Sequence, residues 1–115
     1  MLRILVLDDE PLISMMVRDW LAELGCEIAG PTNSVRGALD LMKTVTVDAA
    51  ILDVSLGSEN CYPVADALFK LGIPIAFATG HSGQEIDPRF NDALIMSKPF
   101  SFEAVKGVVD RLISA

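Results

Sequence analysis

The chain has 115 residues, the usual length of one domain, and 51% of them are hydrophobic, so it can bury a core and is not a disordered chain. Nine basic residues stand against 16 acidic ones, a net charge of −7, and this balance argues against binding to nucleic acid or to an anionic membrane surface. Cys26 and Cys61 are too few for a disulfide framework, and no apolar run has the length of a signal or membrane helix. We therefore expect one domain over residues 1–115, located in the cytoplasm.

Strand-like apolar runs alternate with helical patterns along the chain. Strands are expected at residues 2–7, 26–29, 47–52, 73–78 and 93–96. Helices are expected where apolar residues recur at helical spacing, at residues 11–24, 34–45, 64–71 and 102–113. The first of them places Leu12 and Met16 on its apolar face, and Phe69 and Leu71 mark the third. Residues 82–92 show no apolar stripe, so a helix there is expected to be short and marginal.

Five units of strand and helix with apolar strands predict a parallel sheet covered by helices on both faces. The fold class is α/β, a flavodoxin-like (βα)5 doubly wound sandwich. We adopt its strand order 2-1-3-4-5 from the fold type, without deriving it from this sequence. In such sheets, ligands bind beyond the carboxyl ends of the strands.

Polar residues follow four of the five predicted strands. They are Asp8 and Asp9, Asp53, Thr79, and Lys98. Each alone has a structural alternative as a helix cap, turn or loop residue, but their joint occurrence at four carboxyl ends favours a site. Clustered carboxylates without His or Cys favour Mg²⁺ or Mn²⁺. A lysine and a hydroxyl can bind phosphoryl oxygens, and an aspartate can attack phosphorus.

This set of residues resembles the response-regulator receiver domain of two-component signalling, over essentially the whole chain. The run Phe77-Ala78-Thr79-Gly80 is similar to the receiver subgroup defined by a Phe-Ala-Thr-Gly turn, whose members are often stand-alone proteins. The resemblance implies that Asp53 accepts a phosphoryl group from a phosphohistidine. The donor is expected to be a sensor histidine kinase or a histidine phosphotransfer protein.

The resemblance also implies a role for each residue of the site. Asp9 and Asp53 are expected to bind Mg²⁺ directly, with Asp8 assisting through water and the backbone carbonyl of Ser55 as another ligand. Lys98 is expected to contact the phosphoryl group, and Thr79 to reorient toward it. Ser55 and His81 are expected to flank the water path to the acyl phosphate, although His81 can equally be an exposed loop residue. The resemblance further implies a cis peptide before Pro99.

Two positions depart from the family pattern. Ile95 stands where most receivers carry Tyr or Phe, and Gly57 stands where Pro is common. Because the usual aromatic switch is missing, we hypothesise that residues 80–92 order or shift on phosphorylation.

Several functions remain to be compared. The chain ends just after its last predicted helix, so we expect no output domain and signalling by protein contact or phosphorelay to an unknown downstream protein. Two alternatives remain. The protein can form a homodimer, and the sequence can be a receiver excised from a longer regulator or hybrid histidine kinase. An aspartate-nucleophile phosphatase is disfavoured because Ser55 stands where its general acid is expected. A binding module that has lost phosphorylation is disfavoured by the complete residue set. We therefore expect that the protein is not an enzyme and that it promotes only its own phosphorylation and dephosphorylation.

Overall fold

A parallel sheet of five strands forms the centre of the chain. The computed structural model describes residues 2–56, 59–80, 86–90, 93–97 and 100–114. The sheet has the order β2-β1-β3-β6-β7, which confirms the flavodoxin-like order 2-1-3-4-5. Its strands are β1 (Arg3–Leu7), β2 (Glu27–Thr32), β3 (Ala49–Asp53), β6 (Ile75–Thr79) and β7 (Leu94–Ser97).

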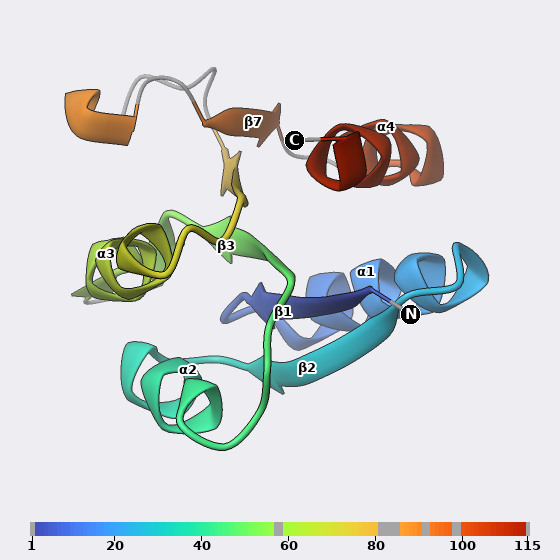
Figure 1. Ribbon diagram of the computed structural model, residues 1–115. Helices are drawn as coiled ribbons and strands as arrows, with labels where there is room; N and C mark the ends of the chain where they lie inside the picture. Colours follow the sequence, from blue (N-terminus) through green and yellow to red (C-terminus); the bar gives the residue numbers. More distant parts are fainter. Residues whose placement is uncertain (1, 57–58, 81–85, 91–92, 98–99, 115) are drawn as a thin grey trace.

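Helices cover both faces of this sheet. They are α1 (Pro11–Glu23), α2 (Val35–Met42), α3 (Tyr62–Lys70) and α4 (Phe102–Ser114). Figure 1 shows α2 and α3 on one face and α1 and α4 on the other. Two short elements follow β3, the antiparallel pair β4 (Ser55–Leu56) and β5 (Glu59–Asn60). In the segment that was expected to form a marginal helix, the described residues form only the 3₁₀ turn η1 (Pro88–Phe90), and residues 81–85 and 91–92 lie outside the described part.

The strands are apolar on both sides because each side packs against helices. Leu52 and Phe77 belong to the cluster that faces α2 and α3, whereas Ile51 and Ala76 belong to the cluster that faces α1 and α4. All five residues of β3 and of β6 are buried. This double burial accounts for the nearly continuous apolar runs in the sequence.

Short-range signals define where the helices begin and end. The Ser34 hydroxyl accepts a hydrogen bond from the Gly37 backbone N–H at 3.0 Å, and the Ser101 hydroxyl accepts one from Ala104 at 3.1 Å. Both are N-cap contacts of the kind that stabilises a helix by about 1 kcal/mol. Gly25 follows α1 with a φ of 81°, a conformation that a residue with a side chain rarely adopts.

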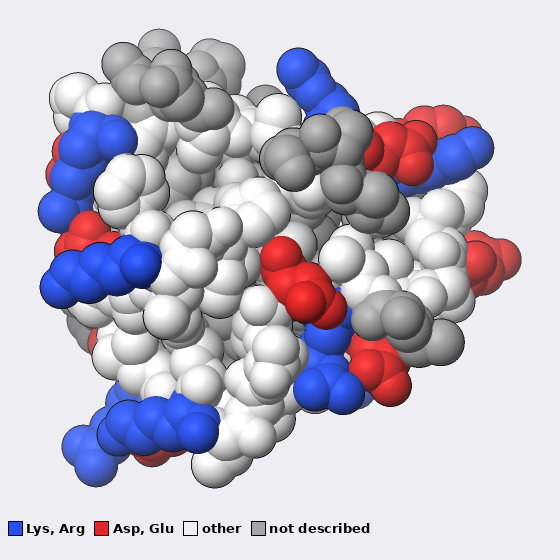
Figure 2. Space-filling view, viewed as in Figure 1, with Lys and Arg blue, Asp and Glu red and all other residues white. Residues whose placement is uncertain are grey.

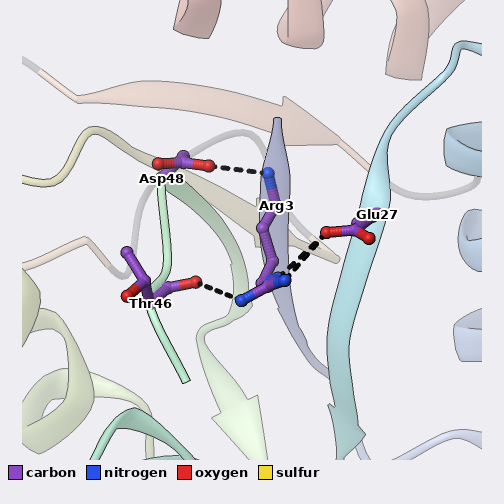
Figure 3. A network of polar contacts seen from close by, with 4 residues as sticks. All are labelled: Arg3, Glu27, Thr46 and Asp48. Atoms are coloured by element: carbon purple, nitrogen blue, oxygen red, sulfur yellow. Dashed lines mark hydrogen bonds and ion pairs between the residues drawn. The ribbon is translucent and has the colours of Figure 1, made fainter. Parts of the chain in front are cut away.

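The amino-terminal ends of three strands are joined by contacts of Arg3 (Figure 3). Its guanidinium donates to Glu27 of β2 at 2.9 Å and to the Thr46 carbonyl at 3.5 Å, and its backbone N–H donates to the Asp48 carboxylate at 2.9 Å. The Arg3 and Glu27 side chains are partly exposed, so the ion pair contributes less than about 1 kcal/mol. The network links Arg3 to its register partner Glu27 in β2 and to the residues that lead into β3.

The structure corrects two details of the predicted elements. The second predicted strand does not end at Ala29, because β2 continues to Thr32, whose carbonyl accepts a hydrogen bond from Asp8 N–H at 3.1 Å. A proline within β2 is tolerated because β2 is an edge strand. Leu12 is 74% exposed and Met16 is 45% exposed, so the apolar stripe predicted for the first helix is wider than the face that α1 buries.

No helix among the described residues is long and apolar enough to cross a membrane.

Candidate functional site

Four carboxylates meet at the carboxyl ends of β1 and β3. Asp8, Asp9 and Glu10 follow β1, and Asp53 is the last residue of β3, which pairs directly with β1. One oxygen from each lies within 4.8 Å of the others, and we call these four residues the acidic cluster. Asp8 and Asp53 are buried at 6% and 4% exposure, whereas Asp9 and Glu10 are exposed. The three aspartates are the residues that the sequence predicted here, whereas Glu10 is a further member that was not predicted, although the Asp-Asp-Glu run is visible in the sequence.

Backbone contacts hold Asp8 at this position. Its N–H donates to the Thr32 carbonyl of β2, and its carboxylate accepts a hydrogen bond from the Glu10 N–H at 2.8 Å. The second contact closes a tight turn immediately before Pro11, the first residue of α1. The carboxylates of the acidic cluster therefore lie near the positive end of the α1 dipole, which favours negative charge.

The chain around Asp53 is equally well fixed. Asp53 pairs with Ala78 of β6, and the next residue, Val54, donates its N–H to the Ala78 carbonyl at 3.1 Å. The Cys61 N–H then donates to the Val54 carbonyl at 3.2 Å, which returns the chain toward α3. Ser55 begins the short strand β4, two residues after Asp53.

Thr79 ends the neighbouring strand, one position beyond the partner of Asp53. It is 4% exposed and pairs with Ser97 of β7, the residue that precedes Lys98. Lys98 itself lies outside the described residues. The predictions for His81, Gly57 and Pro99 fall outside them as well. The described part of the chain thus brings the three predicted aspartates together and places Thr79 at the end of the adjoining strand.

Cys61 is a neighbour of the site that the sequence did not reveal. Its side chain is fully buried, and burial raises the pKa of the Cys61 thiol to about 12, with the Asp53 charge adding to the rise. The thiol is therefore uncharged at neutral pH, which makes it a packing residue rather than a nucleophile or a metal ligand.

A hollow of about 380 Å³ adjoins the acidic cluster between α1 and the end of β2. The hydroxyl oxygens of Ser14 and Thr32, which both line it, are buried without a hydrogen-bond partner. Asp8 and Asp9 line it on the side of the acidic cluster, and Arg18 of α1 lines it as well. A buried hydroxyl without a hydrogen-bond partner lowers the stability of the fold. The hollow is therefore a polar part of the site in which these two hydroxyl groups lack hydrogen bonds.

The donor set of the acidic cluster fits a hard divalent cation. Its ligand atoms are all oxygens at mutually close distances, and the repulsion among several carboxylates is relieved when a cation lies between them. Oxygen-only donors suit Mg²⁺ better than Zn²⁺, which prefers nitrogen and sulfur.

Residues 4–110 match the model of one protein family, the response regulator receiver domain. The chain belongs to this family. Curated relatives include the transcriptional regulatory protein PdtaR of Mycobacterium tuberculosis, 29% identical over 97% of this chain, and the sensory transduction protein LytT of Bacillus subtilis, 36% identical over 92%. The chain spans 57% of PdtaR and 46% of LytT, about half the length of the curated relatives it matches.

Solved receiver structures have the same fold along their whole length. SdrG of Sphingomonas melonis is 42% identical with a TM-score of 0.86, and the match covers 98% of this chain and 97% of that one. The response regulator TrrA of Thermotoga maritima, solved in complex with Mg²⁺ and a beryllium fluoride, is 30% identical with a TM-score of 0.84, over 97% and 99% of the two chains. These matches confirm the predicted family and fold. Receiver domains bind Mg²⁺ at an acidic site, and the described part of this chain contains the acidic cluster.

Proposed function

We propose that this receiver accepts a phosphoryl group on Asp53 from the phosphohistidine of a sensor histidine kinase or a histidine phosphotransfer protein. The signal then passes by contact with another protein or by phosphorelay in the cytoplasm. The observation that carries the proposal is the convergence of Asp8, Asp9 and Asp53 within 4.8 Å at one edge of a receiver fold.

Asp53 acts as the nucleophile. One of its carboxylate oxygens attacks phosphorus, the bond from phosphorus to the donor histidine nitrogen breaks, and an acyl phosphate remains on Asp53. Asp9, Asp53 and the backbone carbonyl of Ser55 would hold Mg²⁺, with Asp8 assisting through water. The cation supplies positive charge where the carboxylates and the phosphoryl oxygens meet. Glu10 adds a fourth carboxylate at the exposed edge of the acidic cluster.

Thr79 and Lys98 bind the transferred group. The buried position of Thr79, one residue beyond the partner of Asp53, supports a hydrogen bond from its hydroxyl to a phosphoryl oxygen. The pairing of Thr79 with Ser97 supports the role of Lys98, because Lys98 follows Ser97 directly. An ammonium group there balances charge that the phosphoryl group brings.

An apolar surface beside the site suits a protein donor. Leu12, Met15 and Met16 of α1 are 74%, 47% and 45% exposed, and they follow the acidic cluster closely in the chain. Exposed apolar side chains grouped on one helix are typical of a surface that a partner covers. A kinase or phosphotransfer protein that packs on α1 brings its phosphohistidine to the edge of the sheet that carries Asp53.

Switching must use a route other than the usual aromatic residue, because that position is Ile95, which is 43% exposed on β7. We propose that residues 80–92, which follow Thr79, order or shift on phosphorylation. Amide hydrogen exchange with and without beryllium fluoride and Mg²⁺ tests this step. Protection should change across residues 80–92, and unchanged protection there would refute it.

Incubation with a small acyl phosphate and Mg²⁺, followed by intact mass measurement, tests the proposed function. We expect one phosphoryl adduct that is absent in Asp53→Asn and that does not form when EDTA is present from the start to remove the cation. Asp110→Asn changes the charge equally at an exposed position on α4 and should keep the adduct. Catalytic turnover of a small phosphoester would instead favour a phosphatase.

A further inference from the structure

The end of the sheet opposite the acidic cluster carries two neighbouring hollows. The larger, about 650 Å³, lies between the end of α3, the starts of β6 and β7, η1 and α4. The smaller, about 440 Å³, lies beside residues 42–47, the connection from α2 toward β3. Ile73 lines both hollows, so they form one continuous surface, which we call the amino-end surface.

Two large apolar side chains project beside these hollows. Phe69 lines the larger hollow and is 69% exposed, and Leu71 lines the smaller one and is 67% exposed. The Phe69 ring meets the Phe90 ring edge to face at 6.2 Å between centroids, so its position is fixed from inside the protein. Single exposed apolar residues are ordinary, but two of them beside one mainly apolar hollow and one of mixed polarity make a patch typical of a protein interface.

The charged side chains that line the two hollows are all basic among the described residues, whereas the chain as a whole is acidic. Arg89 and Arg111 line the larger hollow, and Lys43, which forms an exposed ion pair with Asp40 at 3.6 Å, lines the smaller one. None of the described residues that line either hollow is Asp or Glu. The chain as a whole carries 16 acidic and 9 basic residues. In Figures 1 and 2, the area over the connection that follows α3 is largely white, with Lys and Arg side chains and some acidic ones along its margin.

Arg89 is positioned to meet an incoming acid. Its guanidinium lies over the Phe90 ring at 4.9 Å from the centroid and pairs with Asp66 at 3.0 Å and Asp87 at 3.3 Å. Arg89 and both of these side chains are exposed by a third or more, and such exposed ion pairs contribute little net free energy. A carboxylate from outside can therefore join or replace them at small cost.

We propose that the amino-end surface is a docking site for a segment of a partner protein that combines apolar and acidic side chains. The apolar side chains of this segment enter the larger hollow beside Phe69 and the smaller hollow beside Leu71. Its carboxylates reach Arg89, Arg111 and Lys43. A second copy of this chain is disfavoured, because a two-fold contact would bring the same basic side chains against each other. Because the surface lies at the opposite ends of the strands from Asp53, the partner binds whether or not Asp53 is phosphorylated.

Nuclear magnetic resonance of the full ¹⁵N-labelled chain tests this proposal with a defined probe. The probe is an acetylated peptide of alternating glutamate with leucine or phenylalanine, and the comparison peptide carries lysine in place of every glutamate. We expect the acidic peptide to shift the amide signals of Ile73, Leu94 and Leu112 and to leave those of Asp8 and Asp53 unchanged. Equal shifts with the lysine peptide, or shifts concentrated at the acidic cluster, would overturn the proposal.

Substitutions of single residues show which side chains of the amino-end surface contact the peptide. Arg111→Glu should weaken binding of the acidic peptide at least tenfold, whereas Lys106→Glu, the same charge change at an exposed α4 position outside both hollows, should change it less than twofold. Phe69→Ser, at a residue that is 69% exposed, provides a second variant that does not depend on charge and should also weaken binding. Binding in Asp53→Asn should equal that of the parent, which keeps this test separate from the proposed phosphorylation. Unchanged affinity in both Arg111→Glu and Phe69→Ser, or self-association of the chain that excludes the peptide, would contradict the proposal.

Discussion

Replacing Asp53 by asparagine removes one negative charge from the acidic cluster and nearly preserves the shape of the side chain. In metal-free buffer we expect Asp53→Asn to be more stable than the parent chain. The reason is that Asp53 and Asp8 are both buried, with carboxylate oxygens within 4.8 Å of each other, so their repulsion is poorly screened by water.

The size of the effect follows from that separation. Two unit charges 4.8 Å apart repel by about 0.9 kcal/mol at the dielectric constant of water and by about 3.5 kcal/mol at an effective value near 20. Asp9 and Glu10 are exposed and add less. We therefore expect the free energy of unfolding to rise by about 1–3 kcal/mol at low salt, a shift of several degrees in Tm.

Urea unfolding at low ionic strength measures this difference. Asp110→Asn is the control, because it removes an exposed charge away from the cluster and should change stability by less than about 0.5 kcal/mol. Adding Mg²⁺ should stabilise the parent, since a ligand that binds only the folded state adds to its stability, and should stabilise Asp53→Asn less. A variant that is less stable than the parent in metal-free buffer, or equally stabilised by Mg²⁺, would show that the four carboxylates do not act as one site.

Three further predictions concern the surroundings of the site. The Cys61 thiol ionises near pH 9.0 in the unfolded chain but only near 12 in the folded one, so its contribution to stability is complete below pH 9 and is lost as the pH rises. Between pH 8 and 10 the parent should lose about 1.4 kcal/mol more unfolding free energy than Cys61→Ala, and equal losses would contradict the raised pKa. Tyr62→Phe removes the hydroxyl oxygen that accepts a hydrogen bond from the Asp87 N–H at 2.8 Å. Hydrogen exchange of that amide should therefore accelerate, and the free energy of unfolding should fall by about 1 kcal/mol. An unchanged exchange rate would show that the contact is not formed in solution. Thr32→Val removes a buried hydroxyl without a partner and should raise Tm, whereas a lower Tm would mean that the hydroxyl is satisfied.

The sequence was sufficient to predict the parallel strands and the aspartates of the site, whereas the order of the strands came from the fold type. The strands are apolar on both faces, so their runs stand out in the sequence, and the polar residues that follow four of the five runs mark the carboxyl edge. Asp8 and Asp53 could be placed together because parallel strands end at the same edge. Thr79 followed from the same argument.

Other features depend on tertiary contacts that a local pattern does not encode. Helical spacing shows which residues share a face, but it cannot show whether another element covers that face, so the exposure of Leu12 and Phe69 was not predictable. Cys61 is far from Asp8 in the chain and reaches the site only because the turn after Asp53 returns toward α3. Glu10 was missed because an acid just before a helix is equally expected as a favourable neighbour of the helix dipole.

The most direct test of the account is to locate the phosphoryl group. Sodium borohydride reduces an aspartyl phosphate to homoserine, and peptide mass mapping then identifies the position that carried it. After treatment with a phosphorylated histidine phosphotransfer protein and Mg²⁺, we expect homoserine at position 53 alone. Homoserine at another aspartate, or a stable phosphoryl group with no homoserine at position 53, would contradict the assignment of Asp53 as the phosphoacceptor.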